Sequence, residues 1–153
     1  MPPSTTSLFP DINVWVALTY EGHVHHAVAA AWFAELQPDA TLAFCRFTQL
    51  GLLRLLTTQA VMGDEVMTQP KAWAAYDRWL HDPRVTFVDE PPEIEPRFRS
   101  LTRRRQPATK DWADSFLAAF ATVGGLTLVT FDRGLRAKAR SAMLLQPADD
   151  APA

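Results

Sequence analysis

Hydrophobic positions along the chain fall into two kinds of segment that alternate. Short apolar runs predict strands at 8–10, 41–45, 85–88, 127–131 and 143–147. Apolar residues spaced three and four apart predict helices at 13–20, 23–36, 46–58, 70–80, 96–105, 109–125 and 132–139. The stretch 61–70 is expected to be a connection. Strands that alternate with helices indicate the α/β class, with a small parallel sheet of four to five strands flanked by helices on both faces.

Aspartates follow two of the predicted strands. Asp11 comes directly after the first strand, and Asp132 directly after the fourth. Ligands of parallel sheets bind outside the carboxyl ends of the strands, so both acids are expected on one rim. Asp111 and Asp114 lie three positions apart at the start of the longest predicted helix, and we expect them to point toward the same rim. Each acid also has a structural explanation, because Asp caps helices and stabilises first helical turns.

Carboxylates gathered on one rim need a compensating charge. Like charges a few ångströms apart repel by roughly 1–4 kcal/mol per pair at dielectrics between those of water and of a protein surface. Mg²⁺ or Mn²⁺ prefers oxygen ligands, so this rim is interpreted as a site for a hard divalent cation. Asn13, Thr130 and Asp111 are expected to hold the ligands in place by hydrogen bonds. Plain alternatives are a threonine that favours a strand and polar residues at a helix start.

The composition indicates one packed domain. The chain has 153 residues, of which 48% are hydrophobic and 21% charged, as is typical of globular rather than disordered proteins. We expect a core at about 8–146 and a polar tail at 147–153. Cys45 is the only cysteine, which excludes an internal disulfide and a cysteine-rich zinc site. The chain shows neither an apolar run of about 20 residues nor a signal-like N-terminus, and we therefore expect a cytoplasmic protein without membrane contact.

Five segments carry a resemblance to a known family. They are DINVWVAL, HHAVAAAWF, RFTQLGLLRLLT, DWADSFLAAFA and LVTFDRGL, in this order within about residues 8–146. Their order and spacing resemble the PIN-domain ribonucleases, specifically the VapC-type toxins of bacterial toxin–antitoxin pairs. The resemblance implies a divalent-metal-dependent endoribonuclease with metal ligands at Asp11, Asp114 and Asp132. It also implies a homodimer and a cognate VapB-like antitoxin, whose C-terminal segment covers the acidic rim.

Gln49 is a departure from the family's pattern. The resemblance implies a catalytic Glu early in the helix after the second strand, and that position falls on Gln49. An amide oxygen can ligate a metal or orient its water, but it carries no charge, so weaker cation affinity or a single ion is expected. The alternative function is therefore a PIN-like RNA- or protein-binding module with weak or no catalysis. A phosphatase on another doubly wound sheet is a remoter hypothesis, because DIN stands where such enzymes have an Asp-x-Asp pair.

Binding of RNA requires local cations, because the net charge of the chain is −2. Arginine suits phosphate, since its planar fork donates two hydrogen bonds at once. The predicted RNA-binding residues are Arg97, Arg99, Arg103, Arg104, Arg105 and Arg133. For any single arginine, a solvated helix face is the structural alternative.

Aromatic side chains and histidines are assigned to packing and surface. Four tryptophans lie at helical spacing with other apolar residues and are expected mostly in the core, namely Trp32, Trp73, Trp79 and Trp112. His25 and His26 stand at a helix start far along the chain from the acids. We therefore interpret them as surface or packing residues rather than as catalytic groups.

Overall fold

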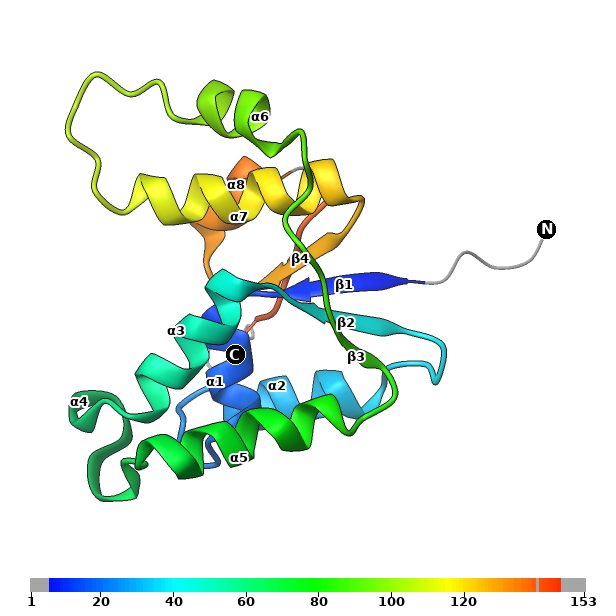
Figure 1. Cartoon of the computed structure of the whole chain (residues 1–153), viewed down its shortest axis with the longest axis vertical. Coiled ribbons are helices and arrows are strands. Elements are labelled where there is room, and N and C mark those ends of the chain that lie inside the picture. The colour runs from blue at the N-terminus through cyan, green and yellow to red at the C-terminus, as the bar shows by residue number, and fades with distance from the viewer. Residues whose placement is uncertain (1–5, 140, 147–153) are drawn as a thin grey trace, which may run out of the picture.

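One parallel sheet forms the centre of the molecule. The structure is a computed structural model that describes residues 6–139 and 141–146. Its strands lie in the order β3-β2-β1-β4-β5, and every neighbouring pair is parallel (Figure 1). The strands are β1 (Ser7–Pro10), β2 (Thr41–Phe44), β3 (Val85–Phe87), β4 (Thr127–Thr130) and β5 (Met143–Leu144). The α/β class and all five predicted strands are confirmed, while the tail expected at 147–153 and the last residue of the fifth predicted strand lie outside the described residues.

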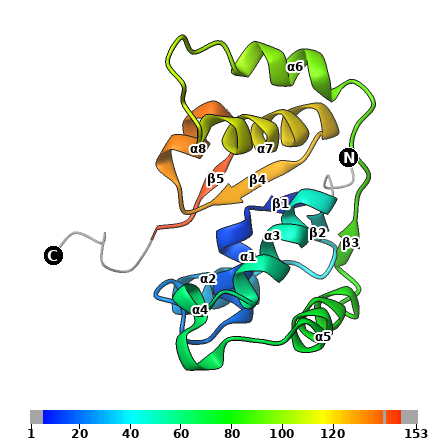
Figure 2. The same cartoon turned by 60° about the vertical axis from the view of Figure 1, so that its left-hand side comes forward.

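Helices cover both faces of the sheet, as Figures 1 and 2 show. One face carries α6 (Ile94–Leu101), α7 (Asp111–Gly124) and α8 (Arg133–Lys138). The other face carries α1 (Ile12–Thr19), α2 (His26–Ala34), α3 (Arg46–Leu56) and α5 (Gln69–Leu80), with the short α4 (Gln59–Met62) and the 3-10 turn η1 (Gly63–Glu65) after α3. None of the helices within the described ranges is long and apolar enough to cross a membrane.

Two hydrophobic cores lie on the two sides of the sheet. Successive residues of a strand point to opposite faces, so one strand supplies both cores. Leu8 packs into the core beneath α1, α3 and α5, and its neighbour Phe9 packs into the core beneath α7. Val129 and Leu128 divide in the same way on β4. Both faces of the sheet are thus covered by helices, and a ligand can approach the central strands at their ends.

Helix boundaries differ most from the predictions at two places, and α2 also begins at His26 rather than at His23. The stretch 61–70, expected to be a connection, contains the end of α4, all of η1 and the beginning of α5. The arginine-rich helix was predicted from Pro96 to Arg105, but α6 begins at Ile94 and ends at Leu101. Proline is tolerated in a first helical turn because its missing N–H has no partner there, so the helix starts ahead of it. Three of the arginines consequently lie in the loop between α6 and α7.

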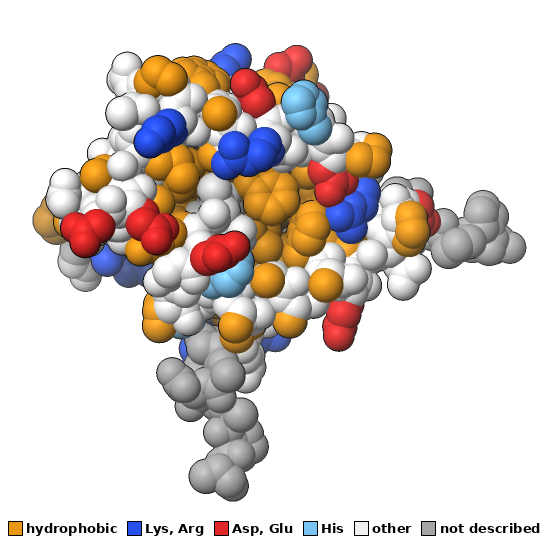
Figure 3. Space-filling model, turned by 90° about the horizontal axis from the view of Figure 1, so that it is seen from below, with side chains coloured by type: hydrophobic (Ala, Val, Ile, Leu, Met, Phe, Trp, Pro, Cys, Tyr) orange, Lys and Arg blue, Asp and Glu red, His pale blue; other side chains and the backbone are white. Residues whose placement is uncertain are grey.

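The tryptophan prediction is half confirmed. Trp32 and Trp79 pack against the core below the sheet. Trp73 on α5 is 47% exposed and Trp112 on α7 is 60% exposed, so the prediction that they lie in the core is wrong. Helical spacing identifies the apolar face of a helix but not how far around the helix the buried surface extends. Both tryptophans stand on the solvent side of an amphipathic helix. Figure 3 views the side on which α5 lies, where hydrophobic side chains are interspersed with charged ones of both signs.

Candidate active site

The strand order places a crevice between β1 and β4. The chain leaves β1 toward β2 on one side, whereas β4 lies on the other side, so the order reverses between them. Ligands of open α/β sheets bind at such a switch point, at the carboxyl ends of the strands. Asp11 directly follows β1, and its backbone N–H donates to the carbonyl oxygen of Val129 at 2.8 Å. Asp132 stands two positions after the end of β4.

Asp11 is the most buried acid of the rim, with 7% of its surface exposed. Its Oδ1 accepts a hydrogen bond from the N–H of Ile12 at 2.6 Å, so it does cap α1. Its Oδ2 accepts from the hydroxyl of Thr130 at 3.1 Å. Burial raises the pKa of Asp11 to about 6, with smaller contributions from Asp114 and Asp132, although both hydrogen bonds oppose the shift. The helix cap explains the position of Oδ1, but it does not explain why a charged carboxylate is buried here.

Thr130 connects the two acids that follow the strands. Its side chain is fully buried at the end of β4. The hydroxyl donates to Asp11 and accepts from the backbone N–H of Asp132 at 3.0 Å. These two bonds fix the orientation of the Asp11 carboxylate and of the backbone at Asp132.

Asp114 and Asp132 complete the acidic group. Asp114 lies half-buried in the first turn of α7. Its pKa is raised first by burial and then by the charge of Asp132, against an opposing effect of Lys138. Asp132 is exposed and caps α8, because its Oδ1 accepts from the N–H groups of Gly134 at 2.8 Å and Leu135 at 3.2 Å. The structure therefore brings the three predicted acids within electrostatic range of one another.

The chemistry of this donor set fits a hard divalent cation. Two carboxylates have a pKa raised by burial and by their acidic neighbours, and the polar partners of Asp11 are the neutral donors Ile12 and Thr130. A divalent ion would offset this excess of negative charge. Across residues 6–139 and 141–146, however, no three His, Cys, Asp or Glu side chains form a group placed to hold a metal. Asp11 and Asp132 accept hydrogen bonds from the protein instead, so binding of an ion would require these side chains to turn.

Asp111 has a different environment from the other acids. It is buried at the start of α7, where it pairs with Lys138 on α8 and lies 3.5 Å from the Nε of Arg104. The hydrogen bond from Lys138 is the main reason that the pKa of Asp111 is lowered. The hydroxyl of Ser115 is a further donor, at 3.4 Å. Asp111 thus joins α7 to α8, and its charge is already compensated.

Gln49 lies in the first turn of α3 and is 7% exposed. Its Oε1 accepts a hydrogen bond from Nη1 of Arg46 at 2.7 Å. It also lies beside Tyr76, whose pKa is raised by burial and lowered in part by a hydrogen bond with Gln49. The amide oxygen is therefore already engaged by Arg46.

A hollow of about 340 Å³ opens over Asp11 and Asp132. It is lined by Asp11, Asn13, His23, Val24, His25, Phe131 and Asp132. Asn13 was predicted near the acids, but the two histidines were not. The turn between α1 and α2 carries them to the rim, where the ring of His25 packs on Phe131 with 4.6 Å between centroids. The sequence shows three histidines within residues 23–26, but it does not indicate where in space the turn that carries them lies.

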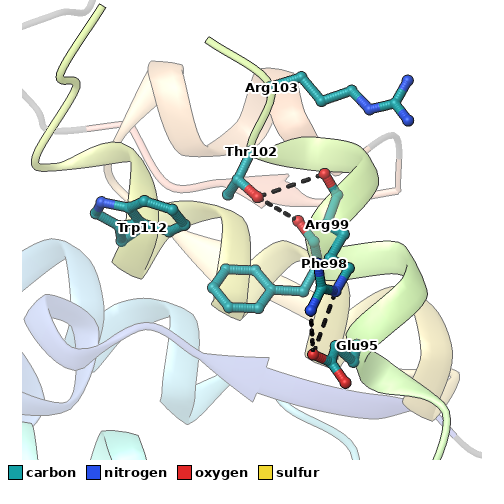
Figure 4. A pocket seen from close by; sticks show the side chains of 6 residues that line it. All are labelled: Glu95, Phe98, Arg99, Thr102, Arg103 and Trp112. Carbon is teal, nitrogen blue, oxygen red and sulfur yellow. Dashed lines mark hydrogen bonds and ion pairs between the residues drawn. The ribbon is translucent and has the colours of Figure 1, made fainter. Parts of the chain in front are cut away.

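The predicted RNA-binding arginines spread over α6, the loop that follows and the start of α8. Arg97 and Arg99 lie on α6, where Arg99 pairs with Glu95 at 3.0 Å on the exposed surface. Arg103, Arg104 and Arg105 are exposed in the loop that leads to α7, and Arg133 is exposed beside Asp132. Figure 4 shows the hollow near this loop, with Arg99, Arg103 and Trp112 at its sides. Figure 1 places the loop on the side of the molecule where α7 begins.

Sequence comparison identifies relatives over most of the chain. The family model of the PIN domain matches residues 8–141. Ribonuclease VapC41 of Mycobacterium tuberculosis is 43% identical over 129 residues, which are 82% of this chain and 88% of the relative.

Solved structures agree on the fold. The Mycobacterium tuberculosis toxin VapC20, which cleaves the sarcin–ricin loop, matches 85% of this chain and 93% of its own, with a TM-score of 0.63 at 17% identity. VapBC2 of Rickettsia felis, bound to a DNA fragment from its promoter, matches 92% and 98%, with a TM-score of 0.64 at 14% identity. The switch-point acids, the strand order and these matches lead to one conclusion: the chain belongs to the PIN-domain family, among its VapC-type members.

Proposed function

We propose that this chain is a divalent-metal-dependent endoribonuclease and the toxin of a toxin–antitoxin pair. The single observation that carries the proposal is the buried carboxylate of Asp11, held at the switch point beside Asp114 and Asp132. The VapC-type relatives named as ribonucleases support the reaction class. The proposal treats the chain as a single PIN-like domain over about residues 8–146.

The proposed site residues divide into ligands and the groups that orient them. Asp11, Asp114 and Asp132 would hold Mg²⁺ or Mn²⁺. A divalent ion supplies stabilisation of charge on the phosphate and a more acidic water. Thr130 keeps Asp11 in place through its hydroxyl, and Asn13 faces the same hollow. Water would attack the phosphorus in line and give up one proton as its oxygen bonds to phosphorus, while the bond to the 3′ oxygen breaks and that oxygen takes up a proton.

RNA contacts and partners form the second part of the proposal. The arginines of α6 and the following loop are proposed to bind phosphates, together with Arg133 beside Asp132. Binding through them weakens as salt rises, because counterions are released from the RNA. We further propose a homodimer in the cytoplasm, inhibited by a VapB-like antitoxin that covers the acidic rim. The likeness to the VapBC2 structure supports the antitoxin.

A second candidate function rests on Gln49. A neutral amide stands at the position of the expected Glu, and its oxygen already accepts a hydrogen bond from Arg46. With one carboxylate fewer, the site would bind cations weakly, and the chain would act as a module that binds RNA or a partner protein without efficient cleavage.

The deciding experiment is cleavage of structured RNA with Mg²⁺ or Mn²⁺. Wild-type protein is compared with a chelator control and with Asp11→Asn and Asp132→Asn, while Asp64→Asn, an exposed residue of η1, serves as the matched control. We expect cleavage to fall by at least about a hundredfold with chelator, in Asp11→Asn and in Asp132→Asn. The reason is that preorganised charge supplies several kcal/mol of transition-state stabilisation. Asp64→Asn should cleave normally. Equal RNA binding with chelator and no cleavage by wild type would favour the binding module.

Gln49→Glu extends the same series. If Gln49 occupies the position of the family's Glu, the added carboxylate should tighten Mg²⁺ binding several-fold in calorimetry. Unchanged affinity would show that this position is not part of the metal site.

A further inference from the structure

An exposed tryptophan and a group of arginines lie together at the start of α7, apart from the acidic hollow. Trp112 lines a separate hollow of about 550 Å³, which we call the Trp112 pocket. Its lining residues are Glu95, Phe98, Arg99, Thr102, Arg103 and Trp112 (Figure 4). This volume is typical of small-ligand sites, which span about 300–1,000 Å³. We propose that the Trp112 pocket binds an unpaired nucleobase and its phosphate, an inference that rests on RNA being the substrate of the proposed nuclease.

Two aromatic rings form the floor for such a base. Figure 4 shows Phe98 of α6 and Trp112 of α7 facing the same space. Their centroids are 6.1 Å apart with the planes at 73°, so the rings meet edge to face. Phe98 is itself held by Phe116, at 5.9 Å and 84°. The indole is therefore supported from one side while 60% of the residue remains exposed. Unpaired bases stack on exposed aromatic rings of this kind.

The charge around the pocket fits a polyanion. Residues 95–105 contain five arginines and one acid, whereas the whole chain has a net charge of −2. The one acid, Glu95, is paired with Arg99. The side chain of Arg103 extends from the rim with its guanidinium away from the two rings, as Figure 4 shows. A cation set apart from a stacking surface suits RNA, in which each phosphate lies one sugar away from its base.

The pocket also lies at the helix start that carries one of the acids. On its other side Trp112 lines a second hollow of about 350 Å³, which includes Arg104. Trp112 and Asp114 stand two positions apart in the first turn of α7. Because side chains two positions apart lie on different faces of a helix, a strand stacked on Trp112 would have to pass around the start of α7 to reach Asp114. The four other lining residues are polar or charged, and two of them are arginines, which favours an anionic ligand over an apolar peptide.

The test measures binding without cleavage. A fluorescein-labelled single-stranded RNA is titrated with full-length protein in the presence of chelator, and anisotropy gives the affinity. Trp112→Ala should weaken binding roughly fivefold to a hundredfold, the effect of losing one base stack. Trp112→Phe should retain most of the affinity. Trp73→Ala, which removes an exposed tryptophan of α5 on the other face of the sheet, is the matched control and should bind as wild type. Circular dichroism confirms that each variant is folded.

A second readout identifies the stacked residue directly. RNA should quench tryptophan fluorescence of wild type and of Trp73→Ala, but the quenching should be largely lost in Trp112→Phe. Duplex RNA, which offers no unpaired base, should show little dependence on Trp112.

Either of two results would overturn the inference. The first is single-stranded RNA affinity of Trp112→Ala within twofold of wild type. The second is an equal loss of affinity of Trp112→Ala for duplex RNA, which would mean that Trp112 does not act by stacking an unpaired base. Both results are independent of catalysis: dependence on Trp112 without any cleavage would leave the pocket standing and remove the nuclease, whereas normal cleavage with no such dependence would do the reverse.

Discussion

Asp11 illustrates how the ionised form of a single buried carboxylate can oppose folding. Its carboxylate is buried and its pKa is raised from the ordinary 3.8 to about 6. Between these two values the folded protein holds a proton that the unfolded chain releases. The stability associated with the protonated group is therefore present below pH 3.8 and is lost as the pH rises through 6. Above pH 6 the ionised group lowers the free energy of unfolding by up to about 3 kcal/mol.

We therefore predict that Asp11→Asn stabilises the metal-free protein while it abolishes cleavage. Urea unfolding at pH 7.5 with chelator should give a free energy of unfolding higher by about 1–3 kcal/mol, because the buried charge is removed. At pH 4 the gain should shrink toward zero, since wild-type Asp11 is then protonated in the folded state. Asp64→Asn should show neither effect. A variant less stable than wild type at pH 7.5 would mean that the charge of Asp11 is compensated in the folded protein.

At the level of residues, the sequence predicted which residues lie at the rim better than it predicted where their side chains point. Asp11 and Asp132 were placed at the rim because each follows a strand, and a strand end fixes where the next residue lies. Gln49 bonds Arg46, three positions earlier on α3, and lies beside Tyr76 of α5; helical spacing allows the first contact, but no local pattern indicates the second. His25 reaches the rim through a turn whose course depends on how α2 packs, so its position near Phe131 was not predictable either.

Between elements, one side chain holds the ends of β1 and β4 together at the site. Thr130 is buried at the end of β4. Its hydroxyl donates a hydrogen bond to the carboxylate of Asp11, which follows β1, and accepts one from the backbone N–H of Asp132, which precedes α8. Its hydroxyl lowers the pKa of Asp11. The same residue type is common in strands for reasons of propensity alone. The two hydrogen bonds distinguish its role here from that of an ordinary strand residue.

We predict that Thr130→Val, which keeps the shape and removes the hydroxyl, raises the pKa of Asp11 further. It should also lower the free energy of unfolding by about 1–3 kcal/mol, because the N–H of Asp132 loses its partner. Cleavage should fall at least tenfold, given the usual effect of losing a group that orients a metal ligand. Thr130→Ser restores the hydroxyl and should recover most of the activity. Equal activity of the valine and serine variants would show that packing alone matters at this position.

Helices and strands were predictable where the hydrophobic period and a terminating residue such as glycine indicated the same boundary. The helix 109–125 ends at Gly125, whose φ of 68° permits the left-handed cap, and the predicted end is within one residue of the observed one. The arginine-rich helix lacks such a stop signal, and α6, which packs against α7, ends at Leu101, four residues before the predicted end. The short α4 and η1 were missed because four and three residues are too few to show a period.

The architecture of the whole molecule explains why its proposed ligand should stabilise it as a unit. The three acids come from the end of β1, the first turn of α7 and the start of α8, and they lie at positions 11, 114 and 132 of the chain. They repel one another in the folded state, and they are far apart when the chain unfolds. An ion shared by them therefore binds the folded protein far better than the unfolded one.

This difference predicts a thermal shift. With Mg²⁺ at about a hundred times its dissociation constant, the stabilisation is about 2.7 kcal/mol. For a chain of this size that corresponds to a rise in the unfolding temperature of about 5–10 °C. Differential scanning calorimetry of wild type with Mg²⁺ is compared with chelator and with Na⁺ at equal ionic strength, which screens charges but is not a divalent ligand. The Asp11→Asn/Asp132→Asn double variant should start at a higher unfolding temperature and show no shift. If the double variant responds to Mg²⁺ as wild type does, the ion stabilises the molecule elsewhere, and the acidic rim is not its site.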